Sequence, residues 1–265
     1  MHVQVISINH GSTPYMDLLL RSLFAHHRDR SRIDVLVLNS GPDHDLDRLD
    51  WARRLGTRIR PSGYPLDVPV STHGEILRDA VLAEPDCDAY LFVDSDVCFT
   101  ADNTIGAMVE ERTADTHLFA VQAAWATVEG TIYDPAGVPN TSTSQIRQAV
   151  RFADQEQWTD SAIFPVGYGD RVHPFCTLVR NDQVFRSIVE LLGLSPAMTE
   201  CVRGGLFWDA LGLLTQVMRT HGRTWTTSAQ SVLHFAGVSW RTDQASRHAA
   251  HRDALLERYA LAHLR

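Results

Sequence analysis

Two aspartates separated by one residue, in Asp94-Ser95-Asp96, are the side chains in this sequence that are best suited to chemistry. They directly follow the apolar run Ala89–Val93, which predicts a buried strand. Carboxylates two residues apart at a strand end can project to one side, and because neighbouring anions repel each other, such a pair usually holds a cation. Oxygen ligands suit Mg²⁺ or Mn²⁺, which can hold a diphosphate and stabilise it as a leaving group. The pair is therefore a candidate metal and diphosphate site, with two solvated aspartates as the alternative.

Two further residues could complete such a site. His234 lies on the predicted apolar strand Ser231–Phe235, where it is either a metal ligand or a buried, hydrogen-bonded side chain. Asp209 follows the turn Gly204-Gly205 and is either a general base or an acid in the first turn of a helix, which the helix dipole favours. Its neighbour Trp208 could line an acceptor site or belong to the core.

Polar residues also end the first two predicted strands, at Asn9 and Asn39. Between these strands and Asp94, the pair His73-Gly74 opens a predicted helix. The amides of a helix N-terminus can receive a phosphate, and a glycine permits close backbone approach. We expect these residues to contact a nucleotide, although His73 and Gly74 could be no more than a helix start.

The elements that position these residues alternate between strands and helices. Strands are predicted over Val3–Ile8, Ile33–Leu38, Thr57–Arg60 and Ala89–Val93, with helices starting at Thr13 as N-cap, near Asp43 and near Thr72. This order predicts an α/β fold with a mostly parallel, Rossmann-like central sheet flanked by helices. The ligand site of such a sheet lies beyond the carboxyl ends of its strands.

The second half of the chain is less regular. We expect strands at Thr116–Ala126, Val172–Val179 and Ser231–Phe235, and helices after Asp182, over Phe207–Arg219 and from about Asp243. The segment Thr127–Asp170 is rich in Gly, Pro, Thr and Asp, and it is long enough to be an active-site lid. With no linker visible, residues 1–265 are interpreted as a single domain, with a nucleotide-binding half (1–100) and an acceptor-binding half (101–265).

Composition excludes several classes of protein. The sequence contains no lysine, so a P-loop NTPase and a pyridoxal-phosphate enzyme are both excluded. Its net charge is −8, without a basic stripe, which argues against nucleic-acid binding. No apolar run approaches the roughly 20 residues that a membrane span needs, and no signal peptide is visible, so we expect a cytoplasmic protein.

The first half resembles the family 2-like GT-A glycosyltransferases. In that family one strand ends in a polar turn, a second ends near Asn-Gly-Ser, a helix starts at His-Gly or Asn-x-Gly, and an apolar strand leads into D-x-D. The corresponding segments are Val3–Asn9, Val35–Gly41, His73-Gly74 and Leu91–Val97. The run Leu233–Trp240 is similar to the C-terminal segment whose histidine often completes the metal site of these enzymes.

The resemblance implies a GT-A fold and a metal-dependent, inverting transfer of a hexose from a nucleoside-diphosphate sugar, with Mn²⁺ or Mg²⁺ as cofactor. It implies that Asp94 faces the ribose, with Ser95 beside it, and that Asp96 and His234 hold the metal. Asp209 would be the base, and Trp208 and Trp240 would lie on the acceptor side. We expect a small soluble acceptor.

One position departs from the family pattern. The family usually has an aspartate just before the Asn that ends strand two, where it recognises the base, whereas this sequence has Leu38. Asp43 or Asp45 could take that role, and UDP remains the favoured nucleotide.

Three other classes compete with this interpretation. A haloacid-dehalogenase-type phosphotransferase carries D-x-D on its first strand rather than its fourth. A nucleotidyltransferase on a related fold needs a better Gly-rich N-terminal loop than Asn9–Thr13 offers. A non-catalytic nucleotide-sugar-binding protein would keep the aspartates but need no base.

Overall fold

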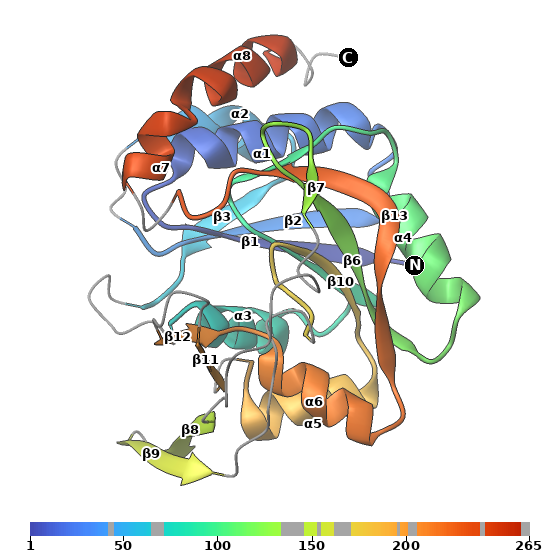
Figure 1. Ribbon diagram of the computed structural model, residues 1–265. Helices are drawn as coiled ribbons and strands as arrows, with labels where there is room; N and C mark the ends of the chain where they lie inside the picture. Colours follow the sequence, from blue (N-terminus) through green and yellow to red (C-terminus); the bar gives the residue numbers. More distant parts are fainter. Residues whose placement is uncertain are drawn as a thin grey trace.

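A mixed β-sheet runs through the computed structural model, with helices on both of its faces (Figure 1). The structure describes residues 1–41, 45–64, 72–133, 146–152, 155–161, 171–194, 197–200, 206–238 and 242–260. Within these residues the strand order is β3-β2-β1-β4-β10-β6-β13-β5, and β7 pairs with β6.

The first four strands of the chain are parallel to one another. They are β1 (Val3–Asn9), β2 (Ile33–Asn39), β3 (Arg58–Pro61) and β4 (Ala89–Val93). Every residue of β1 and of β4 is buried, which is the pattern of strands covered on both faces. The carboxyl ends of β2, β1 and β4 therefore meet at one edge of the sheet, where Asn39, Asn9 and Asp94 follow one another across the strands.

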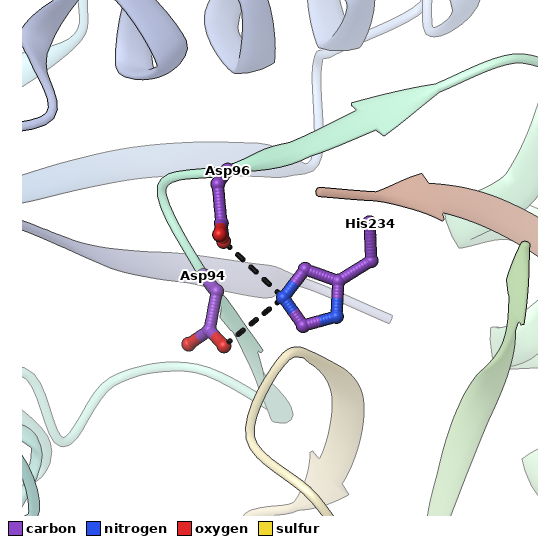
Figure 2. A group of neighbouring side chains, drawn as sticks. All are labelled: Asp94, Asp96 and His234. Atoms are coloured by element: carbon purple, nitrogen blue, oxygen red, sulfur yellow. Dashed lines mark ion pairs between the residues drawn. The ribbon is translucent and has the colours of Figure 1, made fainter. Parts of the chain in front are cut away.

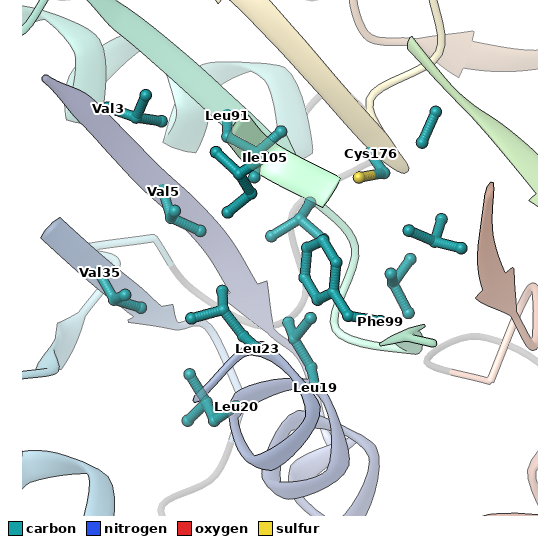
Figure 3. Packing of buried hydrophobic residues seen from close by; sticks show 14 of the residues in the cluster. Val3, Val5, Leu19, Leu20, Leu23, Val35, Leu91, Phe99, Ile105 and Cys176 are labelled. Atoms are coloured by element: carbon teal, nitrogen blue, oxygen red, sulfur yellow. The ribbon is translucent and has the colours of Figure 1, made fainter. Parts of the chain in front are cut away.

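Helices on opposite faces account for the alternation along β1. On one face, Val3 and Val5 pack with residues of α1 (Thr13–His26), including Leu19 and Leu23 (Figure 3). On the other, Ile6 and Ile8 belong to a second apolar cluster with residues of α3 (Thr72–Ala83). Two apolar layers thus fix the register of the strands, because a one-residue slip would exchange their faces.

The second half of the chain extends the sheet beyond β4. It contributes β5 (Val97–Phe99), β6 (Leu118–Ala126), β7 (Ile132–Tyr133), β10 (Cys176–Arg180) and β13 (Thr224–His234). β10 lies antiparallel between β4 and β6, β13 is parallel to β6, and β5 is antiparallel to β13. The helices of this half are α4 (Thr104–Ala114), α5 (Gln183–Leu192), α6 (Gly212–Thr220), α7 (Thr242–Arg247) and α8 (Ala249–Tyr259). The last of these packs along α1 (Figure 1).

The structure confirms the predicted α/β class and the predicted strands, with some boundaries moved. α1 begins at Thr13 with Ser12 as its N-cap, one residue before the expected cap. The helix expected near Asp43 is a 3₁₀ turn, η1 (Leu46–Leu49), followed by α2 (Asp50–Arg54). α3 begins at Thr72, as expected, and the residue before it lies outside the described residues. None of the described helices is long and apolar enough to cross a membrane.

The helix predicted over Phe207–Arg219 begins five residues late. Residues 206–209 form strand β12 (Leu206–Asp209), which pairs with β11 (Ala197–Glu200), and α6 starts only at Gly212. Two bulky aromatic residues in this run favour an extended backbone. Leu211 then adopts a left-handed conformation, with φ of 71°, that separates strand from helix. The irregular segment 127–170 likewise contains β7 and a hairpin of β8 (Ile146–Phe152) and β9 (Gln155–Ser161).

Candidate metal centre

Asp94, Asp96 and His234 come together at the carboxyl edge of the sheet (Figure 2). The Nε2 atom of His234 lies 3.2 Å from Asp96 Oδ1 and 3.6 Å from Asp94 Oδ2. One ligand atom from each of the three residues falls within 4.8 Å of the others. The sequence places these residues up to 140 positions apart, so the fold is what makes them one group.

Strand pairing explains why His234 lies beside the aspartates. β5 starts directly after Asp96, and its antiparallel pairing with β13 sets His234 opposite Val97. The Phe235 amide donates to the Asp96 carbonyl oxygen at 3.0 Å, and the Val238 amide lies 3.5 Å from Asp96 Oδ2. The chain on either side of His234 is therefore tied to the chain on either side of Asp96.

Aromatic side chains hold the imidazole ring in place. The ring of Phe175 stacks on that of His234 at 5.0 Å between centroids and 10° between planes. The ring of Trp125 lies 4.5 Å away, and its Nε1 donates to the His234 carbonyl oxygen at 3.2 Å. With this support the ring presents Nε2 to both carboxylates, and Nδ1 is buried without a hydrogen-bond partner in the described part of the chain.

The three groups perturb one another's protonation. Burial raises the pKa of the Asp94 carboxyl above its usual range, and the charge of Asp96 acts in the same direction. Burial would also raise the pKa of Asp96, but the charge and hydrogen bond of His234 outweigh it and lower that pKa. The two carboxylates in turn raise the pKa of His234 against the effect of its burial. Two carboxylates and one imidazole converging in this way fit a divalent cation that accepts oxygen and nitrogen ligands.

A buried hydrogen-bond network joins this group to the ends of β1 and β2. Ser95 Oγ lies 2.7 Å from Ser12 Oγ, which donates to Asn9 Oδ1 at 3.2 Å. Asn9 Nδ2 donates to Asn39 Oδ1 at 2.8 Å. Asn9 and Asn39 were predicted as nucleotide contacts, and both are almost fully buried. The network orders the three loops that carry the predicted nucleotide site, and Ser12 is a member that the sequence did not single out.

The position of Leu38 is explained by the core. Leu38 is 4% exposed and packs with Ile76 and Leu77 of α3, so it belongs to the apolar layer on that face of the sheet. Of the two possible substitutes for the missing aspartate, Asp45 is exposed with φ of 66°, and Asp43 lies outside the described residues.

His73 and Gly74 lie in the first turn of α3, as predicted. His73 Nε2 is 3.8 Å from Asp94 Oδ1, so the helix start adjoins the metal group. The side chain of His73 is 39% exposed, whereas Gly74 is buried. This arrangement brings a helix N-terminus and a histidine to the side of Asp94 that His234 does not contact.

The predicted base and acceptor residues lie either on strand β12 or outside the described residues. Trp208 and Asp209 end strand β12, where Asp209 pairs with Ala197, so Asp209 precedes α6 instead of occupying its first turn. The structure does not describe their side chains, and Trp240 lies outside the described residues. The roles of all three stay predictions.

A cavity adjoins the metal group on the side of β6 and α7. Its volume is about 350 Å³, and its lining includes His234, Trp125, Glu129, Arg247 and His248. Sequence reasoning missed Trp125, because an aromatic residue near the end of a strand has no signal that separates a site from a core.

Comparisons with known proteins place the fold. No family model matches the chain, and no curated protein matches it. The chain is similar in structure to S. aureus TarS (residues 1–349) with UDP-GlcNAc, with a TM-score of 0.56 and 15% identity over 99% of this chain and 72% of that one. It is also similar to the mannosyltransferase PcManGT from Pyrobaculum calidifontis, with GDP-Man and Mn²⁺, with a TM-score of 0.54 and 12% identity over 98% of this chain and 73% of that one. For glucosyl-3-phosphoglycerate synthase from Mycobacterium tuberculosis, the TM-score is 0.52 and the identity 14%, over 98% of this chain and 80% of that one. The expected resemblance to GT-A glycosyltransferases is thereby confirmed for the fold.

Proposed function

We propose that this protein is a glycosyltransferase that uses a nucleoside-diphosphate sugar and a divalent cation. The observation that carries the proposal is the convergence of Asp94, Asp96 and His234 at the carboxyl edge of a glycosyltransferase-like sheet. The described structures with UDP-GlcNAc and with GDP-Man and Mn²⁺ share this fold, which supports both the donor class and the cofactor. Mn²⁺ or Mg²⁺ is the expected ion.

Each group of the site has a distinct role in this proposal. Asp96 and His234 hold the cation, and Asp94 holds the ribose or shares the ion. A bound divalent cation supplies a Lewis acid that stabilises the charge of the leaving nucleoside diphosphate. The buried Asn9, Asn39 and Ser95 order the loops that surround the nucleotide, and His73 and Gly74 approach its phosphates, with UDP as the favoured nucleotide.

The transfer itself is proposed as a single inverting displacement. Asp209 accepts the proton of the acceptor hydroxyl as that oxygen attacks the anomeric carbon. Trp208 and Trp240 bind the acceptor. The cavity against His234 supports a small acceptor, because its volume of about 350 Å³ lies in the range of small-molecule sites.

A binding panel followed by a turnover assay tests the proposal. The protein is titrated with UDP-, GDP- and dTDP-sugars in the presence of Mn²⁺, Mg²⁺ or EDTA, and the melting temperature is measured. We expect one nucleotide class to stabilise the fold only when metal is present, and Asp96→Asn to lose this response. Asp47→Asn, an exposed aspartate on η1, is the matched control and should respond like the wild type.

The outcomes separate the competing classes of protein. A donor that binds with metal and releases nucleoside diphosphate in the presence of an acceptor supports the transferase. Metal-dependent binding without any turnover favours a non-catalytic binding protein, and release of pyrophosphate from a nucleoside triphosphate favours a nucleotidyltransferase. Stabilisation of equal size in EDTA would show that the aspartates do not act through a cation.

A further inference from the structure

A second group of charged side chains lies at the opposite end of the same sheet. Because β10 is antiparallel to β4, Cys176 lies opposite Val93 near the metal group, whereas Arg180 lies opposite Ala89 at the far end. Arg223 directly precedes β13, the strand whose other end is His234. Arg112 lies in the last turn of α4, and the chain then leads to the start of β6, where Leu118 pairs with Thr224 beside Arg223, at the same end of the sheet.

Among the described residues, one carboxylate lies at ion-pair distance from these arginines. Asp182 Oδ2 lies 3.4 Å from Arg180 Nε and 3.6 Å from Arg223 Nη2. The same side chain caps α5, because its Oδ1 accepts a hydrogen bond from the Phe185 amide at 3.0 Å. Arg223 also donates to the Thr116 carbonyl oxygen at 2.9 Å. The Asp182 carboxylate is therefore shared between two arginines and a helix cap.

Arg112 is the member of this group that forms no ion pair with the described residues. It is 8% exposed, and its Nε is buried with no hydrogen-bond partner among the described residues. Its burial and the charge of Arg180 lower the pKa of the guanidinium, while Asp182 and the exposed Asp88 act in the opposite direction. Asp88 is already engaged, since its Oδ2 accepts the His2 amide at 2.6 Å.

A buried guanidinium nitrogen without a hydrogen-bond partner is costly, because it has lost its water and gained no acceptor in exchange. Arg180 and Arg223 are partly open to solvent, with side chains 34% and 26% exposed. An anion can therefore approach Arg180 and Arg223 from solvent, at the end of the sheet where Arg112 is buried. Three guanidinium groups present many N–H donors in planar forks, which match the oxygens of phosphate better than the two oxygens of a carboxylate.

We propose that Arg112, Arg180 and Arg223 form a binding site for a phosphate group, either free or as the monoester of a small molecule. The site is separate from the proposed donor site, since the two lie at opposite ends of β10 and of β13. A bound phosphate would lie at the end of the sheet opposite to Asp94, Asp96 and His234.

Calorimetry and thermal unfolding with defined probes test this site. The full chain is titrated with inorganic phosphate and with methyl phosphate in EDTA at constant ionic strength, and acetate serves as the carboxylate probe. We expect saturable binding of at least one phosphate probe, a rise in melting temperature, and binding of acetate at least tenfold weaker. If only inorganic phosphate binds, the ligand is the free ion, whereas binding of methyl phosphate admits a monoester.

Matched variants locate the binding. Arg112→Met keeps the apolar stem and removes the charge, and it should weaken phosphate binding at least tenfold. Arg54→Gln, an exposed arginine on α2, should bind as the wild type does. Asp96→Asn should also retain phosphate binding, which separates this site from the proposed donor site.

Two results would overturn the proposal. One is a wild-type protein that shows no saturable response to either phosphate probe. The other is undiminished binding in the arginine variants. If Arg112→Met does not fold, Arg180→Gln and Arg223→Gln, which alter more exposed side chains, provide the same comparison.

Discussion

The two ends of the central sheet carry opposite imbalances of charge. At the carboxyl end of β4, two carboxylates face one imidazole within 4.8 Å. At the other end, Arg180 and Arg223 share the Asp182 carboxylate, and the buried Arg112 Nε has no hydrogen-bond partner among the described residues. The strands β10 and β13 run from one group to the other. One end is suited to a cation and the other to an anion.

The buried side chain of His27 needs no ligand, because the chain itself supplies its hydrogen-bond partners. His27 is 3% exposed, and both of its ring nitrogens are used. Nδ1 lies 2.9 Å from the Leu23 carbonyl oxygen, and Nε2 accepts from the Ile105 amide at 3.0 Å. The contrast indicates that burial alone does not mark a ligand site. The informative feature is a buried charged group whose counter-charge is missing among the described residues.

The largest effect is expected at the carboxylate end. Asp96→Asn removes a charge from the group that holds the cation, and we expect kcat/KM for sugar transfer to fall at least about 1,000-fold, on the order of 4 kcal/mol. EDTA should abolish transfer by the wild type, and added Mn²⁺ or Mg²⁺ should restore it. If Asp96→Asn retained full activity, the carboxylates would need no cation, and the proposed functional difference between the two ends of the sheet would be wrong.

Asp209→Asn should produce the next largest effect. Loss of a general base lowers kcat by roughly 100- to 10,000-fold while leaving donor binding intact, because the base contacts the acceptor. The measurement is kcat for transfer together with the dissociation constant of the donor in the presence of metal. Transfer at the wild-type rate would contradict the role of Asp209, and weakened donor binding would place this residue among the donor contacts instead.

The first half of the fold could be predicted because its signals are local. The run Ala89–Val93 is apolar throughout and leads directly into Asp94-Ser95-Asp96, so strand and site residues lie in one segment. The end of β1 at Asn9 and the end of β2 at Asn39 were predicted in the same way. Parallel order then brings these ends together.

The remaining features depend on pairing between distant segments. The strand containing His234 was predicted, but its position opposite Val97 is set by pairing with β5, a strand of three residues that the pattern did not indicate. The arginine group draws on α4, β10 and the turn before β13, and none of these carries a motif. The predicted start of α6 was wrong. Phe207 and Trp208 fit a helix pattern and a strand pattern equally well, and their pairing with β11 makes them part of a strand.

The protonation of His27 gives a prediction of intermediate size. Burial lowers its pKa from 6.5 to about 4, so the folded protein favours the neutral ring. Since the unfolded chain binds this proton more readily, the free energy of unfolding should fall as pH drops from above 6.5 towards 4, by about 3 kcal/mol from this residue. Denaturant titrations between pH 7.5 and pH 4 measure it. His27→Gln cannot titrate, so its stability should vary less with pH, and an equal slope in both proteins would contradict the assignment.

The smallest effect is expected at Ser12, whose hydroxyl forms hydrogen bonds with other residues of the chain beside the Asp94–Asp96 turn. Ser12 Oγ lies 2.7 Å from Ser95 Oγ and donates to Asn9 Oδ1, so Ser12→Ala removes buried hydrogen bonds that join β1 to the Asp94–Asp96 turn. We expect a loss of about 1 kcal/mol in the free energy of unfolding, the usual net value of such bonds. Ser31→Ala, at an exposed position, is the matched control and should be nearly neutral. Because the turn would still carry both aspartates, metal-dependent donor binding should weaken only a few-fold. A loss comparable to that of Asp96→Asn would mean that the network, and not the charge imbalance, determines whether the cation binds.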